Sequence, residues 1–425
     1  MHVIVLGAGV IGTTTALALV EKGLEVTLVD QAAEVAAATS HANGGGMTPG
    51  HAEPWNPPGT LRRLLSSLGS NDKPYRIDAR ALPGLLGWGM QFLANSRPAR
   101  YYENARRSAR LAVYSGDCLK RLRQRHDLQY QQVLGGSLEL YFSADELEQA
   151  IELRRRINHP GIELRRLRVD ETIAMEPALA PVGHEFHAAL LFPRHESGDA
   201  RVFSQQVAER AVGLGARLVS STTVARIKCS SGRFTGLETS RGEINADACV
   251  VAAGCNSTEL LEPLGLKLPI YPVKGYSTTI ELADDDPAPT MPVLDLRRRF
   301  VTARLGRNHL RIAGLADFAG HDMEIHRQRL KVLLEGAAQL LPRLRDRIMN
   351  APGEPWTGLR PMTPDGPPLL GATPIAGLYL NTGHGAMGWT QAAGSAELVA
   401  DLVAGRKPHI DLTGLQASRY FKTRA

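Results

Sequence analysis

The chain begins MHVIVLGAGVIG (residues 1–12), and this stretch decides the fold. Residues 3–6 form a short apolar run, mostly β-branched, which predicts a buried strand. The run ends at three glycines with GxGxxG spacing, and residues 11–22 have helical composition. A second apolar run at residues 26–29 predicts another strand, which ends at Asp30. Strand, glycines, helix, strand and acid in this order predict a βαβ unit that binds a dinucleotide.

Each residue of this pattern has a physical role. Gly7 permits the tight turn out of the strand, Gly9 lets a diphosphate approach the backbone, and Gly12 lets the helix pack close to the sheet. The helix N-terminus offers unpaired N–H groups and partial positive charge to the diphosphate. Asp30 stands where a carboxylate would accept a hydrogen bond from a ribose 2′-hydroxyl, and its charge disfavours the 2′-phosphate of NADP. The alternative is a glycine-rich turn that binds no ligand.

Length and composition limit the classes of protein to consider. A chain of 425 residues predicts two domains, and fractions of 43% hydrophobic and 22% charged residues are ordinary for a globular protein. The net charge is +6 and the pI about 9.2, but the basic clusters at 154–156 and 297–299 are interleaved with helix or strand residues. We interpret them as solvated faces, not as a nucleic-acid site. A weak attraction to an anionic membrane surface stays open.

The four cysteines have no CxxC or metal-binding spacing, which indicates buried, reduced thiols in a cytoplasmic chain and no metal site. The apolar N-terminus lacks the basic region of a signal peptide, and its apolar residues already belong to the βαβ unit. No run of about 18 apolar residues indicates a membrane span. We therefore expect a cytoplasmic protein whose contact with the inner face of the cell membrane, if it makes one, is peripheral.

The middle of the chain lacks the βαβ rhythm. Residues 36–50 predict a glycine-rich loop that lies against a flat or anionic group, the alternative being a mobile surface loop. Hydrophobic periodicity predicts an apolar helix interrupted by glycines at 81–95, an Arg-rich amphipathic helix at 99–126, a strand pair at 129–141 with its turn at Gly135 and Gly136, and a helix at 144–157. A second domain therefore begins near residue 96.

Later segments return to the nucleotide-binding pattern. Strands are predicted at 188–192, 217–220 and 248–253, with a helix at 201–214 and a meander between 224 and 240. Strands dominate again at 270–281, 299–304 and 309–313, before a helix at 323–341. The sequence thus predicts a nucleotide-binding domain of residues 1–95, 186–265 and 355–425. Residues 96–185 and 266–354 would form a substrate-binding domain.

The C-terminal part contains a second GxGxxG, GHGAMG at residues 383–388, which follows a predicted strand and opens a helix that runs to about residue 403. Too little chain remains for another βαβ unit, and no acid stands at the corresponding position near residue 406. We expect this helix N-terminus to face the redox end of the same cofactor. Its dipole would stabilise negative charge on a reduced flavin by roughly 1 kcal/mol.

The chain resembles the FAD-dependent D-amino acid oxidoreductases from end to end, most of all the bacterial D-amino acid dehydrogenases of the small-subunit type and more loosely glycine oxidase and D-amino acid oxidase. Besides the N-terminal glycines, the likeness rests on SHANGG at 40–45, FPRHESGD at 192–199, VVAAG at 250–254, PVKGYS at 272–277, PWTGLRPMTPDG at 355–366 and NTGHG at 381–385. The resemblance implies an α/β fold. Its parts are a Rossmann-like FAD-binding domain of glutathione reductase type and an inserted α+β substrate domain built on a mostly antiparallel sheet.

The resemblance also implies which residues contact FAD. They are Gly7, Gly9, Val10, Ile11, Gly12, Asp30, Gln31, Ser40, Asn43, Gly44, Gly45, Val224, Ala253, Gly254, Arg360, Gly383, His384, Gly385, Met387 and Gly388. Val224 falls where such proteins make a backbone contact to adenine, and the loops at 43–45 and 383–388 fall against the flavin ring. No cysteine follows Cys255, so we expect FAD to be bound non-covalently.

Three residues are candidates for catalysis. In relatives the arginine that Arg360 matches pairs with the substrate carboxylate, and a guanidinium fork can hold both carboxylate oxygens at fixed geometry. Tyr276 could close over the substrate or donate to its carboxylate; the alternative is a half-buried strand aromatic. His384, like His41, is a candidate proton acceptor. Hydride transfer from the α-carbon needs a neutral amine and an aligned C–H bond, so no protein base is strictly required.

These inferences predict oxidation of a D-amino acid, or of a cyclic D-imino acid such as D-proline or hydroxy-D-proline, to the imine and 2-oxo acid. Hydride would pass to flavin N5 and electrons to a quinone or another acceptor than oxygen. One alternative is an oxygen-using enzyme like glycine or sarcosine oxidase. Another is an FAD-carrying subunit of a multi-subunit dehydrogenase. The sequence does not identify the substrate or the electron acceptor, and it does not say whether the protein forms a homo-oligomer.

Overall fold

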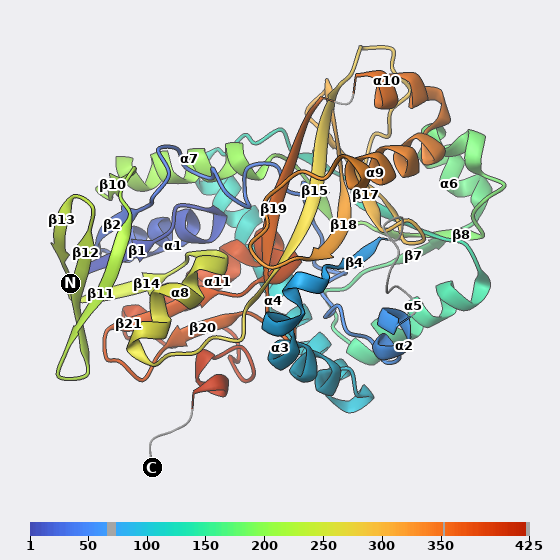
Figure 1. Ribbon diagram of the computed structural model, residues 1–425. Coiled ribbons are helices and arrows are strands. Elements are labelled where there is room, and N and C mark those ends of the chain that lie inside the picture. Colours follow the sequence, from blue (N-terminus) through green and yellow to red (C-terminus); the bar gives the residue numbers. More distant parts are fainter. Residues whose placement is uncertain (66–73, 352, 422–425) are drawn as a thin grey trace.

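The computed structural model describes residues 1–65, 74–351 and 353–421. Two large β-sheets organise this part of the chain, one of six strands and one of nine. In Figure 1 the six-stranded sheet and its helices lie on the left, and the nine-stranded sheet occupies the centre and right. Among the described helices, none is long and apolar enough to cross a membrane.

The six-stranded sheet has the order β10-β2-β1-β14-β21-β20. Its strands pair in parallel, except that β20 is antiparallel to β21. Their bounds are β1 His2–Leu6, β2 Glu25–Val29, β10 Arg217–Val219, β14 Ala248–Val251, β20 Leu369–Ala372 and β21 Leu378–Thr382. The apolar run at residues 3–6 is buried on both faces of this sheet, as a central parallel strand requires.

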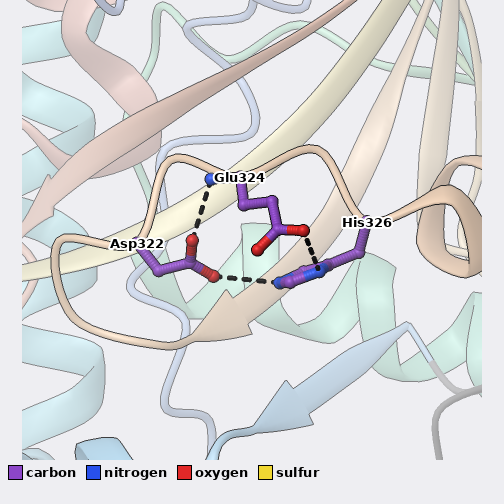
Figure 2. Close-up of side chains that lie close together, drawn as sticks. All are labelled: Asp322, Glu324 and His326. Atoms are coloured by element: carbon purple, nitrogen blue, oxygen red, sulfur yellow. Dashed lines mark hydrogen bonds and ion pairs between the residues drawn. The ribbon is translucent and has the colours of Figure 1, made fainter.

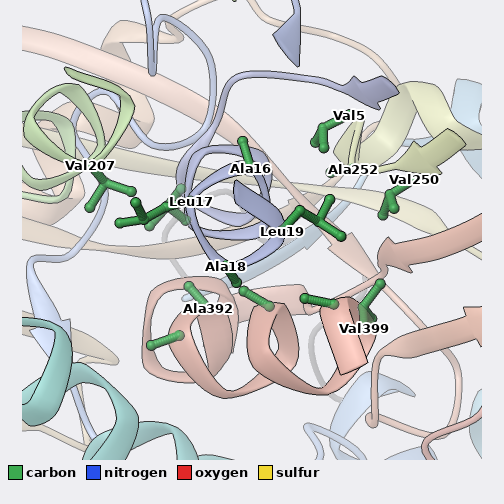
Figure 3. Close-up of a cluster of buried hydrophobic side chains, with 14 of the residues drawn as sticks. Val5, Ala16, Leu17, Ala18, Leu19, Val207, Val250, Ala252, Ala392 and Val399 are labelled. Atoms are coloured by element: carbon green, nitrogen blue, oxygen red, sulfur yellow. The ribbon is translucent and has the colours of Figure 1, made fainter. Parts of the chain in front are cut away.

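One face of this sheet is covered by α1 (Val10–Glu21), α7 (Ala200–Gly213) and α11 (Gly388–Val403). Figure 3 shows α1 packed against α11, with Ala18 and Ala392 at the helix contact and Ala16 on the other side of α1. Small side chains let two helix backbones approach closely, which explains why α1 and α11 can pack side by side on this face. The other face packs on Phe234 and Leu237 of the meander.

The nine-stranded sheet has the order β19-β15-β18-β17-β16-β6-β8-β7, and β4 pairs with β18. Its pairs are antiparallel except β16 with β6 and β18 with β4. The bounds are β4 Tyr75–Ile77, β6 Ser137–Tyr141, β7 Arg165–Leu167, β8 Ala188–Phe192, β15 Tyr271–Glu281, β16 Val293–Asp295, β17 Phe300–Leu305, β18 His309–Phe318 and β19 Glu354–Met362.

The remaining described elements are shorter strands and the outer helices. The meander comprises β11 Val224–Ser230, β12 Arg233–Thr239 and β13 Gly242–Asn245, and a small sheet comprises β3 Gly46–Met47, β9 Glu196–Ser197 and β5 Val133–Leu134. The helices are α2 Thr60–Leu65, α3 Leu82–Asn95, α4 Pro98–His126, α5 Ala144–Ile157, α6 Val169–Met175, α8 Ser257–Leu261, α9 Arg327–Leu340 and α10 Arg345–Asn350. Side-chain caps begin α5 and α7, because Ser143 accepts the N–H of Glu146 and Asp199 accepts that of Arg201.

The predicted strand pair at 129–141 is wrong. β5 pairs with β9, and β6 pairs with β8 and β16. Gly135 and Gly136 have φ of 130° and 105°, and this stretched turn sends the two strands into different sheets. The division into domains stays a prediction, although β4, β8 and β19 pair in the nine-stranded sheet from segments assigned to the nucleotide-binding domain. The sequence of a strand carries no mark of which sheet it joins, so sequence reasoning cannot place these three strands.

Candidate active site

The N-terminal glycines lie where β1 meets α1. Gly7 has φ of 107°, and a Cβ there would lie 2.6 Å from the carbonyl oxygen of Ala252. A Cβ on Gly12 would lie 1.6 Å from the carbonyl oxygen of Gly7. Both positions therefore exclude every other residue. Gly9 differs, because its Cβ would meet only the Ser40 hydroxyl, at 3.4 Å, which leaves a cradle that a diphosphate can enter.

Ser40 and Asp30 fix this loop. The Ser40 hydroxyl accepts the N–H of Val10 at 3.0 Å, at the N-terminus of α1. The Asp30 carboxylate accepts the N–H of Ala8 at 2.5 Å and that of Ala32 at 2.7 Å. Each oxygen thus keeps a further acceptor position for a ribose hydroxyl.

Three other predicted contact residues lie around the same strand ends. The carbonyl of Asp30 accepts the N–H of Thr222, which brings Val224 at the start of β11 close to the end of β2. Ala253 lies beside Gly7, since the Cβ built on Gly7 would be 3.2 Å from its Cα. Gly254 has φ of 56° and open space around its Cα. Gln31 is exposed and Ile11 half-buried at the same loop. The structure therefore brings these predicted residues together at the ends of β1, β2 and β14, and their contact with FAD stays a prediction.

The loop at 43–45 connects this region to the nine-stranded sheet. Asn43 accepts the N–H of Gly45 through its side chain at 3.0 Å, and its carbonyl accepts the Arg311 guanidinium at 2.9 Å. Gly45 has φ of 69°, and a Cβ on Gly44 would contact Val301 at 3.4 Å. Arg311 is a residue that sequence reasoning missed. Arg311 also forms an ion pair with Asp199, the N-cap residue of α7, at 3.3 Å. The sequence signal that could have pointed to Arg311 is this same acid, which ends the segment at 192–199.

The C-terminal glycine loop lines one side of a pocket. Gly383 and Gly385 have φ of 75° and 55°, and a short 3-10 turn, Gly385–Met387, leads into α11. Residues 384–387 line the pocket together with residues 52–56, Phe92, residues 362–363 and Gly366. Among these, residues 52–56 and Phe92 were missed, because a loop and one face of a helix have no pattern that points to a pocket.

Arg360 lies next to this pocket on β19. Its guanidinium stacks over the indole of Trp55 at 5.2 Å and donates to the carbonyl of Leu315 at 3.1 Å. It fills the space above Gly275 of β15, where a Cβ would lie 2.4 Å from Nη1. Burial lowers the pKa of Arg360 to about 10, so the side chain stays charged at neutral pH. In the described ranges no carboxylate lies within ion-pair distance of it.

His384 lies in the pocket wall as a buried side chain, 3% exposed, with Nε2 3.1 Å from the hydroxyl of Ser395. Burial lowers the pKa of His384 to about 3, so the imidazole is neutral at physiological pH. His41 does not join it. That ring stacks on Trp356, with centroids 6.4 Å apart.

Tyr276 does not face the pocket as a free phenol. It is 1% exposed, and its hydroxyl donates to Asp317 at 3.0 Å. Burial and the neighbouring Asp317 carboxylate raise the pKa of Tyr276. Asp317 also pairs with the buried Arg329 at 2.8 Å. The expected closure of Tyr276 over a substrate therefore has no support in its position, because the strand register turns this side chain into the core beside Asp317.

One group of possible metal ligands lies elsewhere. Figure 2 shows Asp322, Glu324 and His326 on the loop before α9, with the Asp322 carboxylate 3.0 Å from Nε2 of His326. The buried ammonium of Lys274 lies 2.6 Å from the same carboxylate. Burial opposes the ionised form, but Lys274 holds the pKa of Asp322 at about 2. A resident ammonium repels a divalent cation, so we interpret the group as an ionic tie between this loop and β15.

A parallel sheet with a glycine loop at the end of β1, an acid at the end of β2 and an open cradle at Gly9 defines a dinucleotide-binding protein. The sequence model of a protein family, the FAD dependent oxidoreductases, matches residues 2–402 of this chain. The chain belongs to this family, as the resemblance predicted, and FAD is its cofactor.

Similar proteins agree with this assignment. A protein of Paramagnetospirillum magneticum named D-amino acid dehydrogenase is 41% identical over 422 residues, 99% of each chain. A protein of Dechloromonas aromatica with the same name is 41% identical over 96% of this chain and 98% of its own. Glycine oxidase from Geobacillus kaustophilus superposes with a TM-score of 0.74 over 99% of both chains at 24% identity. L-Proline dehydrogenase from P. horikoshii gives 0.75, at 18% identity, over 99% of this chain and 96% of its own. The solved structures establish the fold.

Proposed function

We propose that this protein is an FAD-dependent D-amino acid dehydrogenase. It oxidises the α C–N bond of a D-amino acid to an imine, which water hydrolyses to the 2-oxo acid and ammonia. A cyclic D-imino acid such as D-proline or hydroxy-D-proline stops at the cyclic imine. FAD, held non-covalently, supplies the acceptor for the hydride that leaves the α-carbon. Relatives that share 41% of residues over nearly the whole chain and are named for this activity support the proposal.

The observation that carries the proposal is the position of Arg360. A charged guanidinium with no carboxylate partner among the described residues is costly to desolvate unless a ligand pairs with it. Its neighbour Trp55 lines the pocket. An amino acid brings the missing carboxylate, and the guanidinium fork can hold it by two parallel hydrogen bonds.

The other two candidates receive supporting roles. His384 is neutral and buried, so it shapes the pocket wall and leaves the substrate amine to lose its proton to solvent. Tyr276 ties β15 to Asp317 and thereby holds Gly275, the residue under the Arg360 guanidinium. We assign positioning roles to both. Electrons pass on to a quinone or another acceptor than oxygen, at a cytoplasmic site or at the inner face of the cell membrane, where the contact is peripheral.

The test is anaerobic bleaching of the flavin absorption band in the purified holoenzyme. The panel holds D-amino acids, D-proline, cis-4-hydroxy-D-proline, their L-forms, glycine and sarcosine. Bleaching by D-forms alone is expected. Arg360→Ala should lower kcat/KM about 10²- to 10³-fold with an unchanged flavin spectrum, since it removes the partner of the carboxylate.

Two further variants sharpen this test. Gly275→Ala keeps the charge but pushes the guanidinium aside, so it should also lower kcat/KM. Arg343→Ala, at an exposed arginine, is the matched control and should have no effect. Undiminished turnover in Arg360→Ala would remove that residue from carboxylate binding. Rapid reoxidation by air with peroxide release would indicate an oxidase instead. FAD that no amino acid bleaches would indicate a subunit that needs a partner.

A further inference from the structure

Two buried acceptor oxygens in the wall of the pocket have no donor among the described residues. They are Oε2 of Glu53 and Oδ1 of Asn56, and both residues line the pocket. Asn56 is only 1% exposed. A buried acceptor without a hydrogen bond is costly to the fold, so most such atoms in proteins have a partner. Two of them in one pocket wall therefore indicate a ligand that brings hydrogen-bond donors.

The orientation of Asn56 is fixed by the hydrogen bonds that it already makes. Its side-chain amide nitrogen donates to the carbonyl of Phe92 at 2.8 Å and to that of Pro364 at 3.1 Å. Turning the amide over would place its oxygen against these two carbonyl oxygens, and none of the three could then donate. The oxygen is therefore the atom without a partner, and it can only accept.

Glu53 is held by a buried group of charged side chains. Its Oε1 lies 3.1 Å from Nη2 of Arg154 and 3.5 Å from Nδ1 of His51. Glu139 contacts the same two side chains, at 3.5 Å and 2.9 Å, and also accepts the Tyr141 hydroxyl at 2.7 Å. Burial opposes the imidazolium, but the carboxylates of Glu53 and Glu139 raise the pKa of His51. These contacts use one oxygen of Glu53 and leave the other one over.

We propose that Glu53 and Asn56 bind the α-amine of the substrate while Arg360 binds its carboxylate. Trp55, which stacks on the Arg360 guanidinium, belongs to the same pocket-lining loop, so this loop connects both ends of the site. A primary amine that has lost its proton has two N–H groups, which match the two acceptors, whereas a cyclic imino acid has one. The assignment rests on the proposed function, because an amino acid brings both charged groups.

These contacts strengthen during the reaction. The α C–H bond breaks and the hydride passes to FAD with both electrons of that bond. The nitrogen lone pair then forms the second C–N bond, and the nitrogen becomes a cationic iminium. Its N–H groups donate more strongly than those of the neutral amine, above all to a carboxylate oxygen. Glu53 therefore stabilises the transition state more than the bound substrate.

The test measures binding without turnover, by the change in the flavin spectrum of the holoenzyme. The probe 2-aminoisobutyrate has no α-hydrogen to lose, and pivalate carries a methyl group in place of its amine. The wild type should bind 2-aminoisobutyrate more tightly than pivalate. Glu53→Gln should lower this preference about ten- to hundredfold, because an amide whose oxygen accepts from Arg154 turns its N–H groups toward the amine. Arg360→Ala should weaken both probes alike.

Glu139→Gln is the matched control. It removes a carboxylate from the same buried group, but Glu139 does not line the pocket, so the preference should change much less. Turnover gives a second readout, because N-methyl-D-alanine has one N–H fewer than D-alanine. The wild type should favour D-alanine in kcat/KM, and Glu53→Gln should lower this ratio, which does not depend on the fraction of folded protein.

Three results would overturn the assignment. Equal binding of both probes by the wild type, or an unchanged preference in Glu53→Gln, would leave the two oxygens to water. An equal loss of preference in Glu139→Gln would show that the charge of the buried group, and not the contact, selects the amine. The proposed function is tested separately. A flavin that no D-amino acid bleaches, in a protein whose preference for 2-aminoisobutyrate depends on Glu53, would sink the proposed function and support the amine site.

Discussion

Two six-residue segments of this protein, residues 7–12 and 383–388, share the GxGxxG spacing and both lead from a strand of the same sheet into a helix. They differ at the third glycine. A Cβ on Gly12 would lie 1.6 Å from the Gly7 carbonyl oxygen, whereas a Cβ on Gly388 would meet only His384, at an ordinary 3.9 Å. The same letters thus describe a close helix–strand contact in one place and a loose turn in the other.

The first glycines differ less. Gly7 and Gly383 both have positive φ, 107° and 75°, and both face atoms within 3 Å of a built Cβ. The neighbour of Gly7 is backbone, and that of Gly383 is the Thr363 side chain. Spacing therefore predicts the turn in both segments, and the third position decides whether the helix lies against the strand. Substitutions at these glycines and at the residues that hold the two loops test this difference.

Gly12→Ala should have the largest effect. The new Cβ would overlap a backbone carbonyl that cannot move without parting α1 from β1, so we expect a loss of about 3–5 kcal/mol in the free energy of unfolding. Purified protein should lack FAD or fail to fold, which thermal unfolding and the flavin spectrum will show. A stable Gly12→Ala protein with bound FAD would contradict the close contact.

Asp30→Ala tests a second difference between the two loops. The Asp30 carboxylate accepts backbone N–H groups of the N-terminal loop, whereas the segment 383–388 contains no acidic residue. The substitution frees the N–H groups of Ala8 and Ala32 and removes the ribose partner. We expect about 2–3 kcal/mol weaker FAD binding, measured by titrating apoprotein with FAD. Glu34→Ala, at an exposed acid four residues on, is the control and should bind FAD normally. Equal FAD affinity in both variants would show that Asp30 is dispensable.

Much of the fold was readable from such local patterns. The strand at residues 3–6, the helix after Gly388 and the glycine-interrupted helix at 81–95 all lie where periodicity predicted them. Pairing partners were not readable, as the strands on either side of Gly135 show, because hydrogen bonds between strands far apart in the chain leave no local signal. The residues predicted for the N-terminal cofactor loop do lie together, because they stand at the ends of neighbouring parallel strands.

For the catalytic candidates, the sequence could not predict the direction in which each side chain points. Arg360 lies beside the pocket, whereas Tyr276 points into the core toward Asp317. A strand turns alternate residues to opposite faces, so an error of one position in the register exchanges pocket and core. Trp55 was missed altogether, because its place over the Arg360 guanidinium depends on a loop that has no period.

His384 gives the C-terminal loop a pH response that the N-terminal glycines lack. Its pKa is about 3 in the folded protein and about 6.5 in the unfolded chain. Between these values the unfolded chain binds a proton that the folded protein does not, so stability falls as pH falls below about 6.5, by about 1.4 kcal/mol per pH unit. His384→Gln should remove this slope between pH 6.5 and 5, measured by denaturant unfolding. His195, whose pKa burial also lowers to about 3, contributes equally to both proteins. A slope unchanged by the substitution would contradict the buried, neutral assignment.

Gly388→Ala should have the smallest effect, and its two readouts separate two reasons for a glycine. Gly388 has φ of −52° and ψ of −50°, which every residue adopts in a helix, and its built Cβ has room. Replacing a helical glycine with alanine should therefore raise the unfolding free energy of the apoprotein slightly, by about 0.5–1 kcal/mol. FAD affinity should stay within about twofold of the wild type. A stable apoprotein that binds FAD weakly would show that the cofactor occupies the space beside Gly388. The third glycine would then do at residue 388 what Gly9 does at the N-terminal loop, and the two segments would be alike in function although not in packing.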